Sequence, residues 1–135
     1  MKKGLFVALE TLKSIPAALI FATSWHLSSL ERIEQMPSFW NADKLVHTIC
    51  FAGLAFWVSF GISAQSKKDV ALSSLIVSVY GVIDEIHQSF VPTRSASAGD
   101  WIFDTIGAIF GAIAFVFFSK KIAQTLRRLS KRCGG

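Results

Sequence analysis

The hydrophobic residues of the chain fall into four long segments that short polar stretches separate. Three of these segments cover residues 45–63, 70–91 and 101–118. Each is close to the roughly 20 residues that an α-helix needs to cross the hydrocarbon core of a bilayer. The segment 45–63 contains no aspartate, glutamate, lysine or arginine. The pattern therefore predicts three membrane-spanning helices.

The first apolar segment, residues 15–30, follows a stretch that carries Glu10 and Lys13. Apolar residues before position 15 recur at helical spacing with the charges off their stripe, which predicts an interfacial start to this helix. We expect the bilayer-buried part to begin near Ile15, because Pro16 is tolerated in a first turn. A cleaved signal peptide is the alternative, but Glu10 and Lys13 interrupt its apolar run and residues 1–30 contain no A-x-A site. We therefore predict a fourth span.

Hydrophobic residues make up 52% of the sequence, which also has a net charge of +5. The basic residues that follow the last apolar segment are Lys120, Lys121, Arg127, Arg128, Lys131 and Arg132. Basic residues beside a span indicate a cytoplasmic location and attraction to anionic lipid. Nucleic-acid binding is not expected, because no sequence-reading motif accompanies the charge. The lipid bilayer is the expected partner.

The distribution of lysine and arginine predicts the orientation of the four spans. The N-terminus, residues 64–69 and the tail each carry two or more of them near a membrane end. Residues 28–44 carry two together with three acids, and residues 92–100 carry one. By the positive-inside rule both termini are cytoplasmic. We predict an all-α fold, a four-helix transmembrane bundle with N- and C-termini cytoplasmic that forms a single domain over residues 1–135.

The predicted orientation brings polar residues from three segments to the outer face of the membrane. They are Asp43, Lys44, His47, Asp84, Glu85, His87, Gln88, Arg94, Asp100 and Asp104. A carboxylate in the hydrocarbon region costs roughly 2.5 to 3.5 kcal/mol on insertion scales, so we expect these groups to face the bundle interior. A polar pocket that opens to the outside is the favoured interpretation.

Helical spacing allows these side chains to share three faces. The faces comprise Asp84, His87, Gln88 and Val91; Lys44 and His47; and Asp100 and Asp104. Glu85 is turned by about 100° from Asp84 and is expected to pair with a neighbouring helix.

Simpler roles stay open for several members of the set. Asp43 can cap the second helix, where a carboxylate suits the helix dipole. Lys44 can anchor at the lipid headgroups, and Arg94 can balance an acid. His47 and His87 can each be hydrogen-bonded packing residues. Because the set comes from three helices at one depth, a shared polar site is the stronger interpretation.

Gly107 and Gly111 lie four residues apart in the last segment, with Ala108 and Ala112 beside them. Such a face of small residues lets another helix approach closely. Packing inside this bundle is the favoured use of the face, and dimerisation is the alternative. The oligomeric state is not predicted.

Three motifs in a fixed order carry a resemblance to a known family. They are Asp-Lys-x-x-His at 43–47, Asp-Glu-x-His-Gln-x-Phe-x-Pro-x-Arg at 84–94, and Asp-x-x-x-Asp-x-x-Gly at 100–107. Together they resemble the VanZ-like family of small bacterial membrane proteins. The resemblance implies a multi-pass protein of the bacterial inner (plasma) membrane whose motif positions fall on the polar residues named above. It also implies a link to glycopeptide resistance, particularly to teicoplanin, without a stated molecular activity.

The favoured functional hypothesis is a site that binds or acts on an anionic or lipid-linked component of the cell envelope. Lys44 and Arg94 would hold the anion. The candidate catalytic residues for acid–base work are Asp84, Glu85 and His87. The candidate substrate-binding residues are Asp43, Lys44, His47, Gln88, Arg94, Asp100 and Asp104. The alternative is a non-catalytic accessory protein whose charged cluster holds the bundle together.

Metal-dependent chemistry is a further alternative, because the histidines and carboxylates of the set are all potential ligands. Their spacing matches neither His-Glu-x-x-His nor another zinc motif, and the Ser-Gly-His of lipid-phosphate hydrolases is absent. The sequence therefore predicts no metal site, and it identifies no cofactor.

Overall fold

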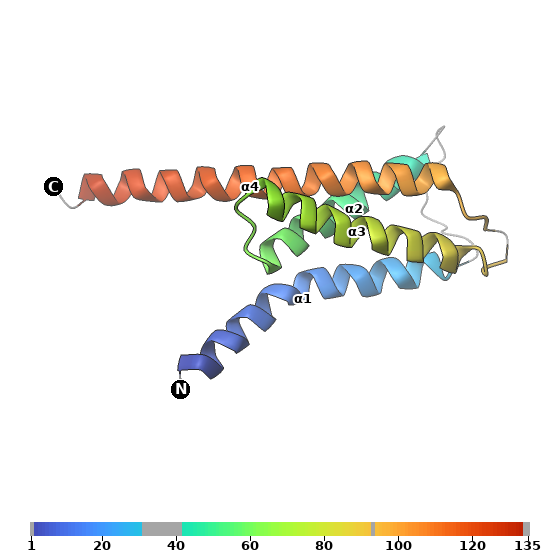
Figure 1. The fold of residues 1–135 in the computed structure, drawn as a ribbon, viewed down its shortest axis with the longest axis horizontal. Helices are drawn as coiled ribbons and strands as arrows, with labels where there is room; N and C mark the ends of the chain where they lie inside the picture. The colour runs from blue at the N-terminus through green and yellow to red at the C-terminus, as the bar shows by residue number, and fades with distance from the viewer. Residues whose placement is uncertain (1, 31–41, 93, 134–135) are drawn as a thin grey trace.

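A computed structural model describes residues 2–30, 42–92 and 94–133 of the chain. They form four α-helices, which are α1 Lys2–Ser28, α2 Ala42–Gly61, α3 Lys67–Gln88 and α4 Ala98–Cys133. The helices lie alongside one another, and successive helices point in opposite directions (Figure 1). The described residues contain no strand. The predicted all-α fold is confirmed.

Three of the helices, α2, α3 and α4, are long and apolar enough to cross a membrane. Judged on its described residues, α1 is not among them, so the fourth span over residues 15–30 stays a prediction. The start of α1 and the end of α4 lie at the same end of the bundle as the α2–α3 turn (Figure 1). If both termini lie on the same side of the membrane, they must be at the same end of the bundle, as they are here. That this side is the cytoplasmic one stays a prediction from the charges.

The third helix spans Lys67–Gln88 instead of the expected 70–91. Its start is stabilised by a capping box: Ser66 Oγ accepts a hydrogen bond from the Asp69 amide (3.3 Å), and Asp69 Oδ2 accepts one from the Ser66 amide (2.9 Å). These bonds satisfy amide groups that a helix start leaves without partners. The helix ends before Val91, because Pro92 disfavours the helical conformation of the residue that precedes it. Backbone chemistry, and not hydropathy, therefore sets both ends.

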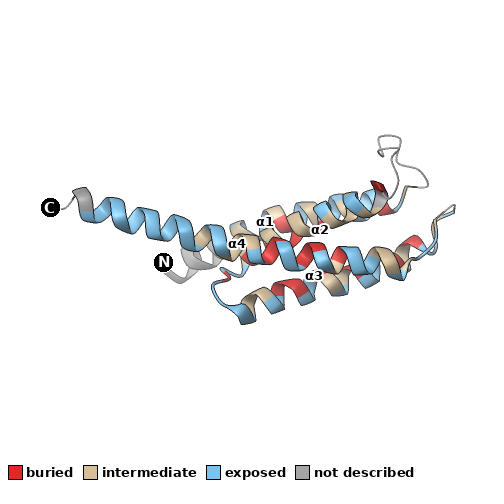
Figure 2. Cartoon of the chain, turned by 90° about the horizontal axis from the view of Figure 1, so that it is seen from above, coloured by how far each residue is buried: buried red, intermediate tan, exposed pale blue. Residues whose placement is uncertain are grey.

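The fourth helix continues far beyond the expected residues 101–118 and ends at Cys133. Residues 119–131 contain neither glycine nor proline and are rich in lysine, arginine and leucine, which favour a helix. This part of α4 extends past the other helices, and its residues are largely exposed (Figure 2). The basic tail is thus a helical projection at the end of the bundle where α1 begins.

Two glycines of α4 bring its backbone against the backbone of α2. A Cβ atom at Gly107 would collide with the carbonyl oxygen of Thr48, and one at Gly111 would collide with that of Ala52. The predicted small-residue face therefore packs inside the bundle. Because Thr48 opposes Gly107 and Ala52 opposes Gly111, α2 and α4 run in the same direction, and α3 runs opposite to both.

The apolar core surrounds this contact. Its buried members are Ala17, Phe51, Leu54, Ala55, Val58, Val77, Ala108 and Ala112. Toward the end where α2 and α4 begin, buried polar side chains take the place of apolar ones, among them Asp84, Gln88 and Asp104. The polar site therefore adjoins the helix–helix contact directly.

Replacing Gly111 with valine should destabilise the bundle, because the new side chain would collide with the backbone of Ala52. Overpacking of this kind costs about 1–3 kcal/mol. The free energy of unfolding in a denaturing-detergent titration measures the effect. Gly53→Ala is the matched control, since nothing lies within 4 Å of a Cβ at Gly53. A Gly111→Val protein as stable as Gly53→Ala would contradict the close contact.

Candidate functional site

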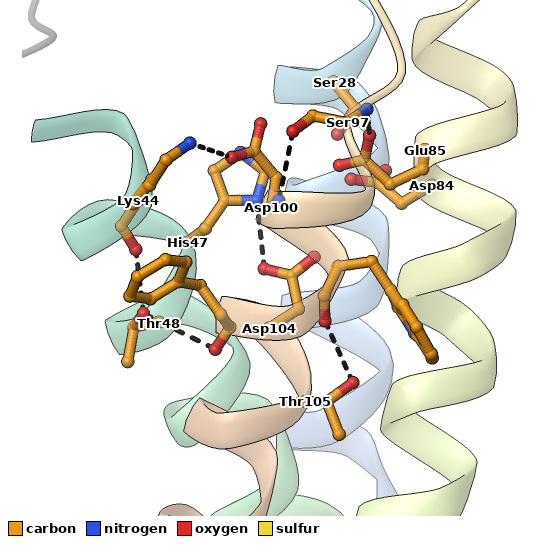
Figure 3. A network of polar contacts seen from close by, with 12 residues as sticks. Ser28, Lys44, His47, Thr48, Asp84, Glu85, Ser97, Asp100, Asp104 and Thr105 are labelled. Atoms are coloured by element: carbon orange, nitrogen blue, oxygen red, sulfur yellow. Dashed lines mark hydrogen bonds and ion pairs between the residues drawn. The ribbon is translucent and has the colours of Figure 1, made fainter. Parts of the chain in front are cut away.

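Polar side chains of α2 and α4 meet in two pairs near the start of both helices (Figure 3). Lys44 Nζ donates a hydrogen bond to Asp100 Oδ1 at 2.6 Å. His47 Nδ1 lies 3.1 Å from Asp104 Oδ1. The parallel direction of the helices explains the pairing, because about one turn separates the two members on each helix. Two of the three predicted faces therefore contact each other.

The third helix supplies three more buried polar side chains beside these pairs. Asp84, Glu85 and Gln88 are 1%, 6% and 4% exposed. Asp84 Oδ2 accepts a hydrogen bond from Gln88 Nε2 (3.0 Å), in agreement with their predicted common face. Glu85 Oε2 accepts one from the backbone amide of Ser97 (2.6 Å), just before α4. Glu85 therefore contacts a neighbouring segment, as its turn away from Asp84 predicts.

Three carboxylate oxygens of this region have no hydrogen-bond partner among the described residues. They are Asp84 Oδ1, Glu85 Oε1 and Asp104 Oδ2. A buried polar group without a partner costs about 1–3 kcal/mol, and more when it is charged. Such groups are few in native proteins, and three together mark this region as the candidate site.

His87 lies apart from this buried group. Its ring stacks on Trp25 of α1 with the ring centroids 4.0 Å apart. Its Nε2 lies 2.9 Å from Ser29 Oγ. The predicted face of α3 therefore divides, because Asp84 and Gln88 are buried while His87 contacts α1. The catalytic role assigned to His87 stays a prediction.

Arg94 and Asp43 complete the predicted set. Arg94 Nε donates a hydrogen bond to the carbonyl oxygen of Leu30 (3.2 Å). Within the described parts of the chain, the ion pairs of the site are Lys44–Asp100 and His47–Asp104, so Arg94 does not balance an acid there. The side chain of Asp43 lies outside the described residues, and both its capping role and its binding role stay predictions.

A cavity of about 340 Å³ lies between α1, α2 and α3, next to the buried polar residues. The end near the start of α2 is lined by Ser28, His47, Asp84, Gln88 and Arg94. The part deeper in the bundle is lined by Leu19, Ile20, Ile49, Cys50 and Gly53. The cavity therefore combines an apolar interior with a polar end.

The first helix contributes site residues that the three motifs do not contain. Gln88 Nε2 donates a hydrogen bond to Ser28 Oγ (3.4 Å), and Trp25 stacks on His87. Ser24 also lines the cavity. Ser24 and Ser28 are four residues apart in an apolar segment and therefore share one helix face. This spacing was the sequence signal that could have indicated the contribution of α1.

A comparison with protein-family models matches residues 3–119 to the family described as VanZ/LLP1. The matched range includes every polar pair of the site and the whole cavity lining. No curated protein and no solved structure matches the chain.

Lys44→Ala should lower the free energy of unfolding by about 1–2 kcal/mol, because Asp100 would lose a charged donor in a partly buried position. The reciprocal exchange, Lys44→Asp with Asp100→Lys, should recover at least half of the loss. Lys68→Ala is the control. Lys68 is exposed and lies at the start of α3, at the end of the bundle away from the Lys44–Asp100 pair. If the exchanged pair is as unstable as Lys44→Ala, the ion pair does not account for the contribution of Lys44.

Proposed function

The chain belongs to the VanZ/LLP1 family, and from this premise we propose that it binds an anionic, lipid-linked component of the bacterial cell envelope. The observation that carries the proposal is the cavity between α1, α2 and α3, with its apolar interior and polar end. A ligand that joins a hydrocarbon chain to a charged headgroup is the chemical class that suits both parts. The association of VanZ-like proteins with teicoplanin resistance agrees with a role in the envelope.

The cavity is large enough for a headgroup and the adjoining part of a hydrocarbon chain. Its volume of about 340 Å³ falls within the range of about 300–1,000 Å³ for small-molecule sites. The apolar residues come from α1 and α2, and both helices also expose large apolar side chains such as Leu19 and Ile49. The remainder of a long chain would therefore leave the cavity between these helices and lie among the lipid tails.

We assign recognition of the anion to Arg94, which lines the polar end of the cavity. A guanidinium group can donate two parallel hydrogen bonds to phosphate oxygens. The sequence placed Lys44 in the same role, but Lys44 Nζ is 2.6 Å from Asp100 and does not line the cavity among the described residues. The proposal therefore assigns the anion to Arg94 alone, because the amide group of Gln88 already donates to Asp84 and Ser28.

An acid–base step on the bound ligand, if the protein catalyses one, would use Asp84. Its carboxylate lines the cavity, and Oδ1 has no partner among the described residues. His87 stacks on Trp25 and Glu85 bonds to Ser97, and neither of them lines this cavity. We therefore assign this step to Asp84 and not to His87 or Glu85.

A structural, non-catalytic role is the second candidate function. It is favoured by the two pairs that connect the same two helices, Lys44–Asp100 and His47–Asp104. Removal of one partner from a buried pair is destabilising whether or not the pair binds anything. This candidate predicts loss of stability in single variants without any measurable ligand, so ligand binding separates the two functions.

Gly53→Phe should abolish binding of a polyprenyl phosphate, because the ring would fill the apolar part of the cavity. Gly53 lines the cavity, and a Cβ there meets nothing within 4 Å, so the substitution should be tolerated by the fold. Native mass spectrometry of the detergent-solubilised protein measures the bound fraction. Gly53→Ala is the matched control and should bind like the wild type. Equal binding by Gly53→Phe and Gly53→Ala would place the ligand elsewhere.

Arg94→Ala should weaken polyprenyl phosphate binding by about 10-fold or more, since a charged hydrogen bond contributes about 1.5–3 kcal/mol. Binding of the uncharged polyprenol should change little. Arg127→Ala removes the same charge from the exposed part of α4 and serves as control. If Arg94→Ala and Arg127→Ala lose the same amount of binding, the effect is a general attraction between a basic protein and an anionic lipid, and Arg94 does not recognise the anion.

A further inference from the structure

Three helices each contribute one potential metal ligand to a single point in the bundle. His47 of α2, Glu85 of α3 and Asp104 of α4 offer ligand atoms that all lie within 4.8 Å of one another. Glu85 and Asp104 are buried, and His47 is half-buried. Figure 3 shows the three side chains approaching from different helices. In the sequence they are far apart, so no spacing motif could reveal them.

A separate observation is that two carboxylate oxygens at this point have no hydrogen-bond partner among the described residues. Asp104 is 0% exposed and its Oδ2 has no hydrogen-bond partner among the described residues. Glu85 is 6% exposed, and its Oε1 also has no hydrogen-bond partner among the described residues. Two carboxylates so close together repel each other when both are ionised. A cation between them would satisfy the free oxygens and remove the repulsion.

Each of the two carboxylates uses only one of its oxygens in a contact with the described residues. His47 contacts Asp104 through Oδ1, which leaves Asp104 Oδ2 free. The Ser97 amide contacts Glu85 through Oε2, which leaves Glu85 Oε1 free. These two contacts hold each carboxylate in place while one oxygen stays available. An outer-shell donor such as the Ser97 amide orients a ligand in known metal sites, whereas His47 and Asp104 would exchange their mutual contact for bonds to the ion.

We propose that His47, Glu85 and Asp104 bind one divalent first-row transition ion of the Zn²⁺ or Mn²⁺ class. An imidazole with two carboxylates suits these ions, whereas Ca²⁺ and Mg²⁺ take oxygen ligands. The ligand atoms of the three residues lie within 4.8 Å of one another, compared with about 3.4 Å between two ligands bonded at about 2.1 Å to a tetrahedral ion. Small movements of the three side chains toward the ion would close this difference.

The ion would stand beside the cavity, because His47 belongs both to the metal site and to the cavity lining. Three protein ligands leave at least one coordination position for water or for an anionic oxygen. The metal site is nevertheless distinct from Arg94 and from the apolar interior. Metal binding can therefore be present even if the lipid-linked ligand is not, and each can be tested without the other.

Equilibrium dialysis of the chelator-treated, detergent-solubilised full chain against Mn²⁺ or Zn²⁺, followed by elemental analysis, tests the proposal. We expect one ion per chain. Glu85→Gln and Asp104→Asn keep the shape of the side chains and should weaken binding by at least about 10-fold, the lower limit for the loss of even an outer-shell partner. Asp69→Asn is the control, because it removes a carboxylate at the other end of α3, about 24 Å from Glu85 along the helix. This variant should bind the ion like the wild type.

The wild-type protein alone provides a second test, which holds even if a variant fails to fold. Pulsed electron paramagnetic resonance of bound Mn²⁺ should show ¹⁴N coupling from the His47 imidazole, and a folded His47→Gln protein should lack it. The proposal is overturned if the wild type binds no stoichiometric ion, as expected if the carboxylates share a proton instead. It is equally overturned if bound Mn²⁺ shows no nitrogen coupling.

Discussion

The structure depends on the direct contact between the backbones of α2 and α4. Helices in a membrane are not driven together by the hydrophobic effect, so close packing and polar contacts must hold them. Gly107 and Gly111 leave room for the carbonyl groups of Thr48 and Ala52. The same contact keeps the two helices parallel and in register, which sets Lys44 opposite Asp100 and His47 opposite Asp104. The site is therefore a consequence of helix packing one to two turns away.

The polar cluster combines two requirements that oppose each other. Charged groups buried in a membrane protein are stable only with partners, and the Lys44–Asp100 and His47–Asp104 pairs supply some of them. Among the described residues, Glu85 Oε1 and Asp104 Oδ2 have no partner, so the pairing there is incomplete. The proposed ion would supply the missing partner.

Parts of this arrangement follow from the spacing of residues along the chain. The hydrogen bond between Asp84 and Gln88 and the turn of Glu85 toward another segment are both consequences of helical periodicity. Helix ends were predicted less well, because hydropathy does not register the Ser66–Asp69 capping box or the helix-forming residues of the basic tail. The position of His87 could not be predicted from the periodicity of α3 alone, because its stacking on Trp25 depends on where α1 lies.

The sequence by itself determined the class of the protein, its all-α fold, its family and the set of polar residues at one end of the bundle. Hydropathy, helical periodicity and ordered motifs are local properties, and each can be read along the chain. Only the tertiary structure decided which of these residues meet. Whether Arg94 or Lys44 reaches the cavity, and whether His47, Glu85 and Asp104 converge, depends on the register between helices. That register is set by the contact of Gly107 and Gly111 with the backbone of α2, and the sequence shows the glycines but not the part of α2 that they meet.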